Sequence, residues 1–198
     1  MKLSKILRSA LVALVACVLA FAVTACGNNE EEAVREAVDA QMASFLNVAE
    51  SDLVSQLDEE SIATLQEYGV DAVEYYTHCF KNFSYEITDV TVDGDTATVT
   101  LNVTNANLGE ALNAAGEDFG VFAASDEATE LYQSEGEEAL FAKLFEYLYA
   151  RLDAEDVELV TTEAQLTLTK GEEGWTVDGF SDSFISAVYG GTDISAEL

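Results

Sequence analysis

The amino-acid sequence predicts an α+β fold in which helices pack on an antiparallel sheet of two hairpins. Three observations favour this fold. Apolar residues first recur at helical spacing, they then alternate with polar residues in two separate stretches, and a helical segment lies between those stretches. Helices and strands that come in groups, rather than one by one, are typical of segregated α and β layers. One domain is therefore expected over residues 30–190.

Three helical regions are expected before the first strand. Apolar side chains on one face predict a helix from Glu30 to Asn47, and three glutamates at its start suit the positive end of the helix dipole. One or two short helices are expected over residues 49–69, closed by Gly69. Asp71 is the expected N-cap of the third helix. Its inner face is expected to carry Val73, Tyr76, Cys79, Phe80 and Phe83.

Strict alternation predicts the two hairpins. The first consists of residues 84–92 and 95–103 around an Asp93-Gly94 turn, and its alternation slips between Ile87 and Val90, which indicates a bulge. The second consists of residues 157–170 and 174–180 around the sequence GEEG. The inward-facing residues are expected to be Ala97, Val99, Leu101, Val103, Ala164, Leu166, Leu168, Trp175 and Val177.

The remaining helices lie between and after the hairpins. Residues 108–122 form a weak helical pattern that Gly116 and Gly120 are expected to break, whereas Glu137–Leu152 has a wide apolar stripe. A short C-terminal helix is expected to start at Ser181 or Asp182 and to end at Gly190. Residues 191–198 are expected to form a loose tail.

The charge of the chain restricts its partners. There are 38 acidic and 8 basic residues, and three of the basic ones, Lys2, Lys5 and Arg8, precede every acid. Such an acidic body repels phosphate backbones and anionic membrane surfaces, so nucleic acid is not an expected partner. The charge either serves solubility outside the cell or attracts a cationic partner or a divalent ion.

The first 25 residues have the pattern of a secretory signal, because a basic start is followed by 17 uncharged residues from Ser9 to Ala25. At its end, Val23-Thr24-Ala25-Cys26 resembles the lipobox of bacterial lipoprotein precursors. That resemblance implies cleavage before Cys26, thioether lipidation of its sulfur and acylation of the new N-terminus with fatty acids such as palmitate. Residues 26–29 then form a lipidated tether. An uncleaved anchor and ordinary signal cleavage are the alternatives.

The other two cysteines carry less information. Leu14-Val15-Ala16-Cys17 also fits the four-residue lipobox, but Cys26 is the better site because the sequence turns polar directly after it. Cys79 stands alone in the folded part, so a buried free thiol is expected there and no internal disulfide. Neither His78 beside Cys79 nor Asp93-Gly94-Asp95 has the spacing of a zinc or calcium site, so no metal is expected.

The two hairpins, ITDVTVDGDTATVTL and LTLTKGEEGWTVDGF, resemble those of bacterial lipoproteins with a nuclear transport factor 2-like fold. The resemblance covers about residues 30–190. It implies a curved sheet and helices that together form a cone. Because that fold hosts enzymes, transport factors and binding modules, it does not choose among functions. The helical stretch between the hairpins is longer than the pattern of that family.

No catalytic constellation is recognisable in the sequence. Ketosteroid isomerases of the same broad fold use an aspartate, a tyrosine and an acid, and Asp178 is a candidate for the aspartate. His78 is a candidate general base and Cys79 a candidate nucleophile, but neighbours on a helix point about 100° apart. The residues that a pocket is expected to recruit are Tyr75, Tyr76, His78, Tyr147, Tyr149 and Trp175.

The sequence therefore predicts a lipoprotein anchored by its N-terminal lipid on the extracytoplasmic face of a membrane in the bacterial cell envelope. Its expected role is that of a monomeric, non-catalytic module, without cofactor or metal, that binds a small molecule or an envelope protein. Two alternatives remain open at this point. One is a small enzyme with a cone-shaped pocket, and the other is a purely structural envelope protein.

Overall fold

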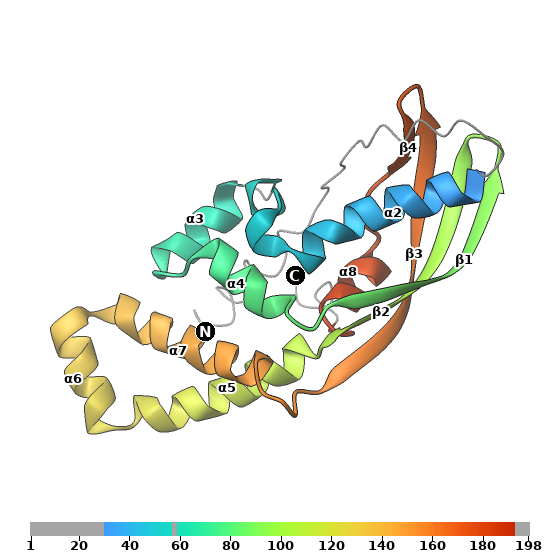
Figure 1. Ribbon diagram of the computed structural model, residues 1–198. Coiled ribbons are helices and arrows are strands. Elements are labelled where there is room, and N and C mark those ends of the chain that lie inside the picture. The colour runs from blue at the N-terminus through green and yellow to red at the C-terminus, as the bar shows by residue number, and fades with distance from the viewer. Residues whose placement is uncertain (1–29, 57–58, 193–198) are drawn as a thin grey trace.

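The computed structural model describes residues 30–56 and 59–192 and confirms the predicted α+β fold (Figure 1). Within these residues, seven α-helices accompany one four-stranded antiparallel sheet. The predicted signal peptide, the lipidated tether and residues 193–198 of the predicted tail lie outside the described residues. The elements follow the predicted order of helices, hairpin, helices, hairpin and helix.

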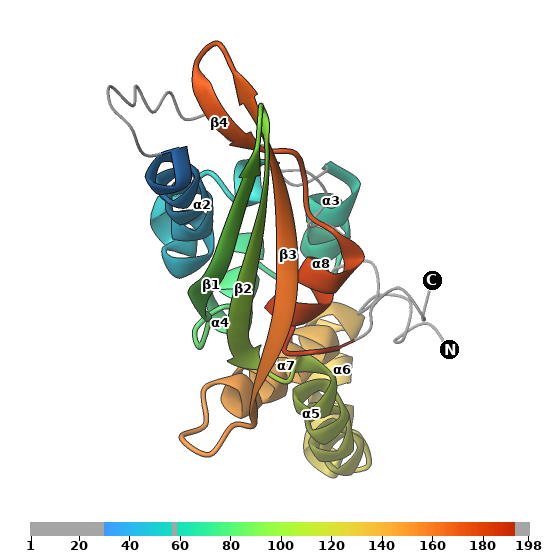
Figure 2. The ribbon, with the colours of Figure 1, turned by 90° about the vertical axis from the view of Figure 1, so that its right-hand side faces the viewer.

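The sheet is a simple meander with the strand order β1-β2-β3-β4. The first hairpin consists of β1 (Ser84–Asp93) and β2 (Thr96–Ala106), and the second consists of β3 (Leu159–Gly171) and β4 (Gly174–Val177). Strand β2 pairs with β3 over its whole length, from Thr96 opposite Thr169 to Ala106 opposite Leu159. This central pairing joins the two hairpins into one curved sheet (Figure 2).

The first hairpin has the bulge that the sequence predicts, because the pairing register shifts between Ile87 and Asp89. Its turn lies one residue later than predicted. Gly94 and Asp95 are the two loop residues, and Gly94 has a φ of +63°, which suits the mirror-image turns of two-residue hairpins. Asp93 instead ends β1, where it pairs with Thr96.

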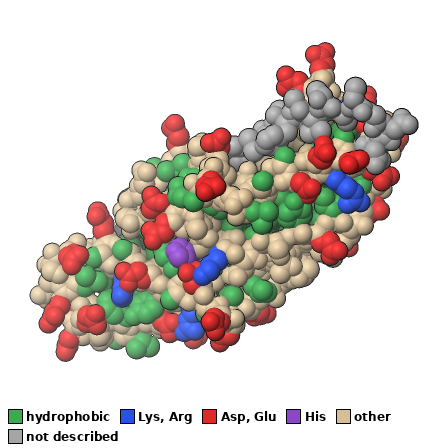
Figure 3. Space-filling model, viewed as in Figure 1, with side chains coloured by type: hydrophobic (Ala, Val, Ile, Leu, Met, Phe, Trp, Pro, Cys, Tyr) green, Lys and Arg blue, Asp and Glu red, His purple; other side chains and the backbone are tan. Residues whose placement is uncertain are grey.

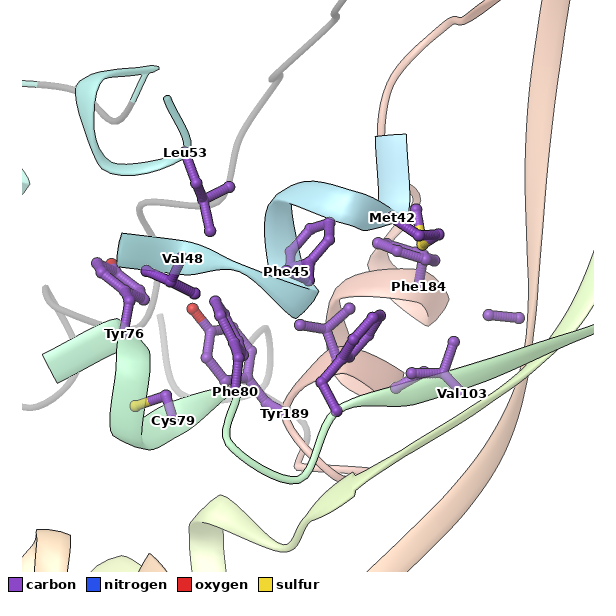
Figure 4. Close-up of a cluster of buried hydrophobic side chains, with 14 of the residues drawn as sticks. Met42, Phe45, Val48, Leu53, Tyr76, Cys79, Phe80, Val103, Phe184 and Tyr189 are labelled. Atoms are coloured by element: carbon purple, nitrogen blue, oxygen red, sulfur yellow. The ribbon is translucent and has the colours of Figure 1, made fainter. Parts of the chain in front are cut away.

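One face of the sheet is buried under α2 (Glu30–Leu46), which contacts β1 and β4, and under α8 (Asp182–Val188), which contacts β2 and β3. Phe45 of α2 and Phe184 of α8 meet with ring centroids 6.0 Å apart, and Figure 4 shows both rings within the same apolar cluster. All the sheet residues that were expected to face inward are at most 2% exposed: Ala97, Val99, Leu101, Val103, Ala164, Leu166, Leu168, Trp175 and Val177.

Beyond α2, short elements lead to the first strand. They are the 3₁₀ turns η1 (Val48–Glu50) and η2 (Val54–Gln56) and the helices α3 (Glu59–Glu67) and α4 (Ala72–Cys79). Asp71 caps α4 as predicted, because its carboxylate accepts a hydrogen bond of 2.9 Å from the Glu74 amide. The prediction for Val73 is wrong, since it is 37% exposed. Helix α4 buries Tyr75 instead, because an aromatic ring removes more apolar surface from water than valine does.

The segment between the hairpins folds into three helices where two helical parts were expected. They are α5 (Leu108–Ala123), α6 (Asp126–Glu135) and α7 (Glu137–Leu152), which we call the helical arm. Helix α5 continues through Gly116 and Gly120 because the packing of α5 along α7 outweighs the cost of glycine in a helix, about 1 kcal/mol each. The bounds of α7 are those predicted.

The arm extends from the end of the sheet that lies opposite the hairpin turns (Figure 1). It follows β2 and leads back into β3, so both of its connections enter the central strand pair. Helix α8 starts after Ser181, whose hydroxyl accepts a hydrogen bond from the Phe184 amide at 3.2 Å. The structure thus selects Ser181 over Asp182 as the cap. Gly190 follows α8 with a φ of +63° and lies against Ala106.

Candidate functional site

The structure does not gather the six predicted pocket residues at one place. Tyr75 and Tyr76 are fully buried in the apolar core, where their rings meet edge to face at 4.9 Å (Figure 4 labels Tyr76). Trp175 lies in β4, at the far end of the sheet from the arm. Asp178 follows β4 and accepts a hydrogen bond from Thr169 at 3.0 Å. These residues therefore do not form one pocket with the tyrosines of α7.

His78 and Tyr149 do lie together, where α4 meets the arm. Their rings stack at 4.2 Å with an angle of 12° between the planes. Nδ1 of His78 lies 3.0 Å from an oxygen of Asp153, the residue that ends α7, and Lys81 lies 3.2 Å from the other oxygen. Partial burial acts to raise the pKa of Asp153, but the bonds to His78 and Lys81 outweigh it and hold that pKa below its ordinary value.

A histidine oriented by a carboxylate can act as a general base, but it needs a partner to deprotonate. Its sequence neighbour Cys79 is a free cysteine, 3% exposed, and burial raises the pKa of the thiol to about 12. Cys79 therefore stays protonated, which confirms the expected buried thiol and removes it as a nucleophile. The Tyr149 hydroxyl also stays protonated, because burial, aided by the charge of Glu74, raises its pKa.

The tyrosines around Cys79 belong to the core. Tyr75 and Tyr189 are both 0% exposed, and burial raises the pKa of each hydroxyl well above its ordinary value. Beside them Asn105 donates hydrogen bonds to the carbonyls of Cys79, at 2.9 Å, and Val188, at 2.6 Å. This polar cluster joins α4, β2 and α8, and its role is to hold the body of the protein together.

Trp175 anchors the beginning of α2 to the second hairpin. Its indole nitrogen donates a hydrogen bond of 3.1 Å to Glu30, whose other carboxylate oxygen is 2.6 Å from the ammonium group of Lys170. The same ammonium group lies over the indole ring at 5.8 Å. The hydrogen bond from Lys170, followed by that from Trp175, lowers the pKa of Glu30. The chain therefore enters the domain at the hairpin end.

The arm carries the better candidate for a functional site, a groove of about 450 Å³ that opens to solvent between α6 and α7. We call it the α6–α7 groove. Four apolar residues from the three helices of the arm line it: Phe122, Leu131, Ala139 and Ala142. Four glutamates accompany them: Glu127, Glu130, Glu135 and Glu146. The groove thus combines apolar contact area with charged groups, which in ligand sites fix orientation and provide specificity.

The groove has one basic residue, and its charge is already engaged. Lys143 forms an ion pair of 2.5 Å with Glu146 and lies over the Tyr147 ring at 5.7 Å. The hydrogen bond to Glu146 raises the pKa of Lys143, so the ammonium form is favoured. In the described part of the chain, no ion pair joins a basic side chain to Glu127, Glu130 or Glu135. The groove is therefore electronegative.

A second hollow, of about 460 Å³, lies between the end of α3 and the turn that joins α6 to α7. Tyr68 and Phe141 form one wall, with their rings edge to face at 4.6 Å. The carboxylates around it are Glu67, Glu135, Glu137 and Glu138. Glu135 borders both hollows, so they are adjacent and form one continuous acidic region around the α6–α7 turn. Figure 3 shows acidic side chains across this face of the molecule and few basic ones.

The sequence singled out none of the groove-lining residues as site candidates, and it assigned no helix to residues 126–135, which supply half of them. Ser125 carried the missing signal. Its hydroxyl accepts a hydrogen bond from the Ala128 amide at 3.2 Å, and Asp126 and Glu127 follow it at the start of α6. A serine followed by acids is typical of a helix N-terminus.

Comparisons with known proteins identify no relative, since no model of a protein family, no curated protein and no solved structure matches the chain. Two further findings concern only residues 30–56 and 59–192. None of their helices is long and apolar enough to cross a membrane. They also contain no group of three or more histidine, cysteine or acidic residues that could hold a metal ion. The structural feature that bears on function is therefore the α6–α7 groove of the arm.

Proposed function

We propose that this protein is a lipid-anchored binding module on the extracytoplasmic face of a bacterial envelope membrane, which holds a ligand or partner without converting it. The observation that carries the binding role is the α6–α7 groove. Phe122 and Leu131 give it an apolar floor, and glutamates from α6 and α7 surround that floor. Apolar contact supplies affinity in such sites, and charge selects the partner.

The lipobox ending at Cys26 supports the anchoring role. The folded domain begins four residues later, at Glu30, which the second hairpin holds through Lys170 and Trp175. Four residues span at most about 14 Å, so a lipid on Cys26 would be attached within that distance of Glu30.

A catalytic role is the second candidate function, and the pair of His78 and Asp153 favours it. The binding role has more support for two reasons. The inner face of the sheet, where a cone pocket would lie, carries fully buried side chains such as Val99 and Leu101. The tyrosines that an isomerase mechanism would recruit, Tyr75 and Tyr76, lie within the core.

Labelling with a fatty acid tests the anchor. Cells that express the full chain are grown with a clickable palmitate analogue, and the purified protein is analysed for the label. We expect the label in the wild type and in Cys17→Ser, and none in Cys26→Ser. Label that persists in Cys26→Ser would contradict the assignment of Cys26.

Native mass spectrometry of the full chain purified from its host tests the binding role. We expect a bound small molecule or protein that is recovered chemically unchanged and is retained in His78→Gln. The catalytic alternative predicts that the bound species is altered on incubation and that His78→Gln stops the alteration. That second outcome would overturn the binding role.

A further inference from the structure

The α6–α7 groove is amphipathic, and its occupant has to match both of its parts. Leu131 of α6 and Ala139 and Ala142 of α7 lie at the apolar part. Glu127 and Glu130 lie one turn apart on α6 and put two charges on the same rim. The small side chains of the two alanines leave room for apolar side chains of an incoming segment.

The charge of the arm excludes several occupants. Residues 108–152 contain ten acidic and two basic residues, and both basic side chains are engaged within the arm. Lys143 pairs with Glu146, and Arg151 of α7 pairs with Asp118 of α5 at 2.5 Å. Anionic lipids and nucleic acids are repelled by such a surface. A second copy of the arm is repelled as well, because like charges would then face each other.

The shape of the groove favours a peptide segment over a small molecule. Grooves that stay open along one side are the sites in which amphipathic helices bind, with apolar side chains on the floor and polar ones at the edge. Phe122 lies in the lining of the groove and adds aromatic area to it. Aromatic residues are enriched at the centres of protein interfaces.

The groove lies at the end of the molecule opposite the start of α2, and this position determines which proteins can reach it. The beginning of α2 lies at the hairpin end of the sheet and the arm at the opposite end (Figure 1). If the anchor is on Cys26, as proposed above, the arm points away from the membrane that holds the lipid. The groove is then presented to proteins of the extracytoplasmic space.

We propose that the α6–α7 groove binds a lysine- or arginine-rich amphipathic segment of an extracytoplasmic protein. The apolar side chains of that segment pack on Phe122, Leu131 and Ala142, and its basic groups pair with Glu127 and Glu130. This inference rests on the proposed binding function and adds the chemistry of the partner.

The test uses the full lipidated chain in nanodiscs of uncharged phosphatidylcholine. The probe is a fluorescein-labelled helix of about 14 residues, with leucine at positions i, i+3, i+4 and i+7 and lysine elsewhere. Fluorescence anisotropy gives its Kd. A scrambled peptide of the same composition, without one apolar face, is the peptide control, and empty nanodiscs control for binding to lipid.

Three variants locate the binding site. Glu127→Gln with Glu130→Gln removes two charges from the groove, and Ala142→Phe fills its floor. Glu172→Gln with Glu173→Gln removes two exposed charges from the turn between β3 and β4 and is the matched control. Circular dichroism verifies that each variant is folded.

We expect both groove variants to weaken binding by about tenfold or more, and the turn variant by less than about twofold. Equal losses in the two charge variants would overturn the inference, since they would show attraction to the overall charge. Equal binding of the scrambled peptide, or none of the designed one, would overturn it too. If native mass spectrometry still finds a ligand and Glu127→Gln/Glu130→Gln retains it, the binding function stands and this inference fails.

Discussion

The body of the protein and its helical arm are stabilised in different ways. In the body, the sheet, α2, α4 and α8 bury large side chains such as Tyr75, Phe45 and Phe184 completely. In the arm, α7 buries four large side chains, but two of the four buried residues of α5 are alanines and α6 buries only Ala128. The outer part of the arm, around α6, therefore has small contacts and an open groove, whereas the body has a filled core. A surface that binds partners can be carried by the loosely packed region because the closely packed one supplies most of the stability.

The largest expected effect comes from Gly190, where body and arm meet. A Cβ at this position would lie 2.1 Å from the carbonyl oxygen of Ala106 and 2.8 Å from the Cα of Asn107. Both neighbours are backbone atoms and cannot move aside easily. We expect Gly190→Ala to lower the free energy of unfolding by about 4 kcal/mol or more, measured by urea denaturation.

The matched control for this substitution is Gly69→Ala. Gly69 has a φ of +70°, similar to that of Gly190, but no atom lies within 4 Å of the point that its Cβ would occupy. It therefore reports the cost of the left-handed backbone alone, about 1–2 kcal/mol. Equal losses at the two positions would contradict the proposed contact with Ala106.

The second effect is expected at Asn105, which is 1% exposed and links three elements of the body. Asn105→Ala leaves the carbonyls of Cys79 and Val188 without this donor, in a place that water does not reach. We expect a loss of about 2–4 kcal/mol in the free energy of unfolding. Asn113→Ala, an exposed position in α5 of the arm, is the control and is expected to change it by less than about 0.5 kcal/mol. Similar losses would show that burial in the body is not the cause.

The body was predicted well because period-two alternation directly reports burial on one face of a sheet. Ala97 to Val103 and Ala164 to Leu168 were all placed correctly, as was the cap at Asp71. The arm was predicted less well. Helix α6 has one buried residue in ten, so its sequence contains no apolar stripe that would predict a helix. In α5, Gly116 and Gly120 suggested a break in the helix, but packing against α7 keeps the helix continuous.

The candidate site was not predictable from local sequence. The groove forms because α5, α6 and α7 fold back on each other, so its residues come from positions as distant as Phe122 and Glu146. The sequence pointed to aromatic residues as pocket candidates instead, but the large side chains of Tyr75 and Tyr76 fill the apolar core. Of the predicted set, His78 of α4 and Tyr149 of α7 stack on each other across two elements.

The arm can be stabilised at its glycines, which is the third effect. No atom lies within 4 Å of the Cβ position of Gly116 or Gly120, and both residues are helical. We expect Gly116→Ala and Gly120→Ala each to raise the free energy of unfolding of the arm by about 0.5–1 kcal/mol. Hydrogen exchange of α5 amides measures this local change. A destabilised arm in either variant would show that these glycines serve close packing.

The smallest effect concerns the contact of Asp153 with His78 and Lys81, which joins the arm to α4. Asp153 has a lowered pKa in the folded protein, so its stabilising contribution is fully present above the ordinary value of 3.8 and is lost as the pH falls through the folded pKa. Since the group is partly exposed, the contribution is expected to stay below about 1 kcal/mol. Melting temperatures followed by circular dichroism from pH 2.5 to 7 should therefore differ between the wild type and Asp153→Asn above pH 3.8, and the difference should shrink as the pH falls from there through the folded pKa. Asp156→Asn removes an exposed carboxylate three residues further on and should follow the wild type. A constant difference between Asp153→Asn and the wild type at every pH would mean that the side chain acts through shape and not through its charge.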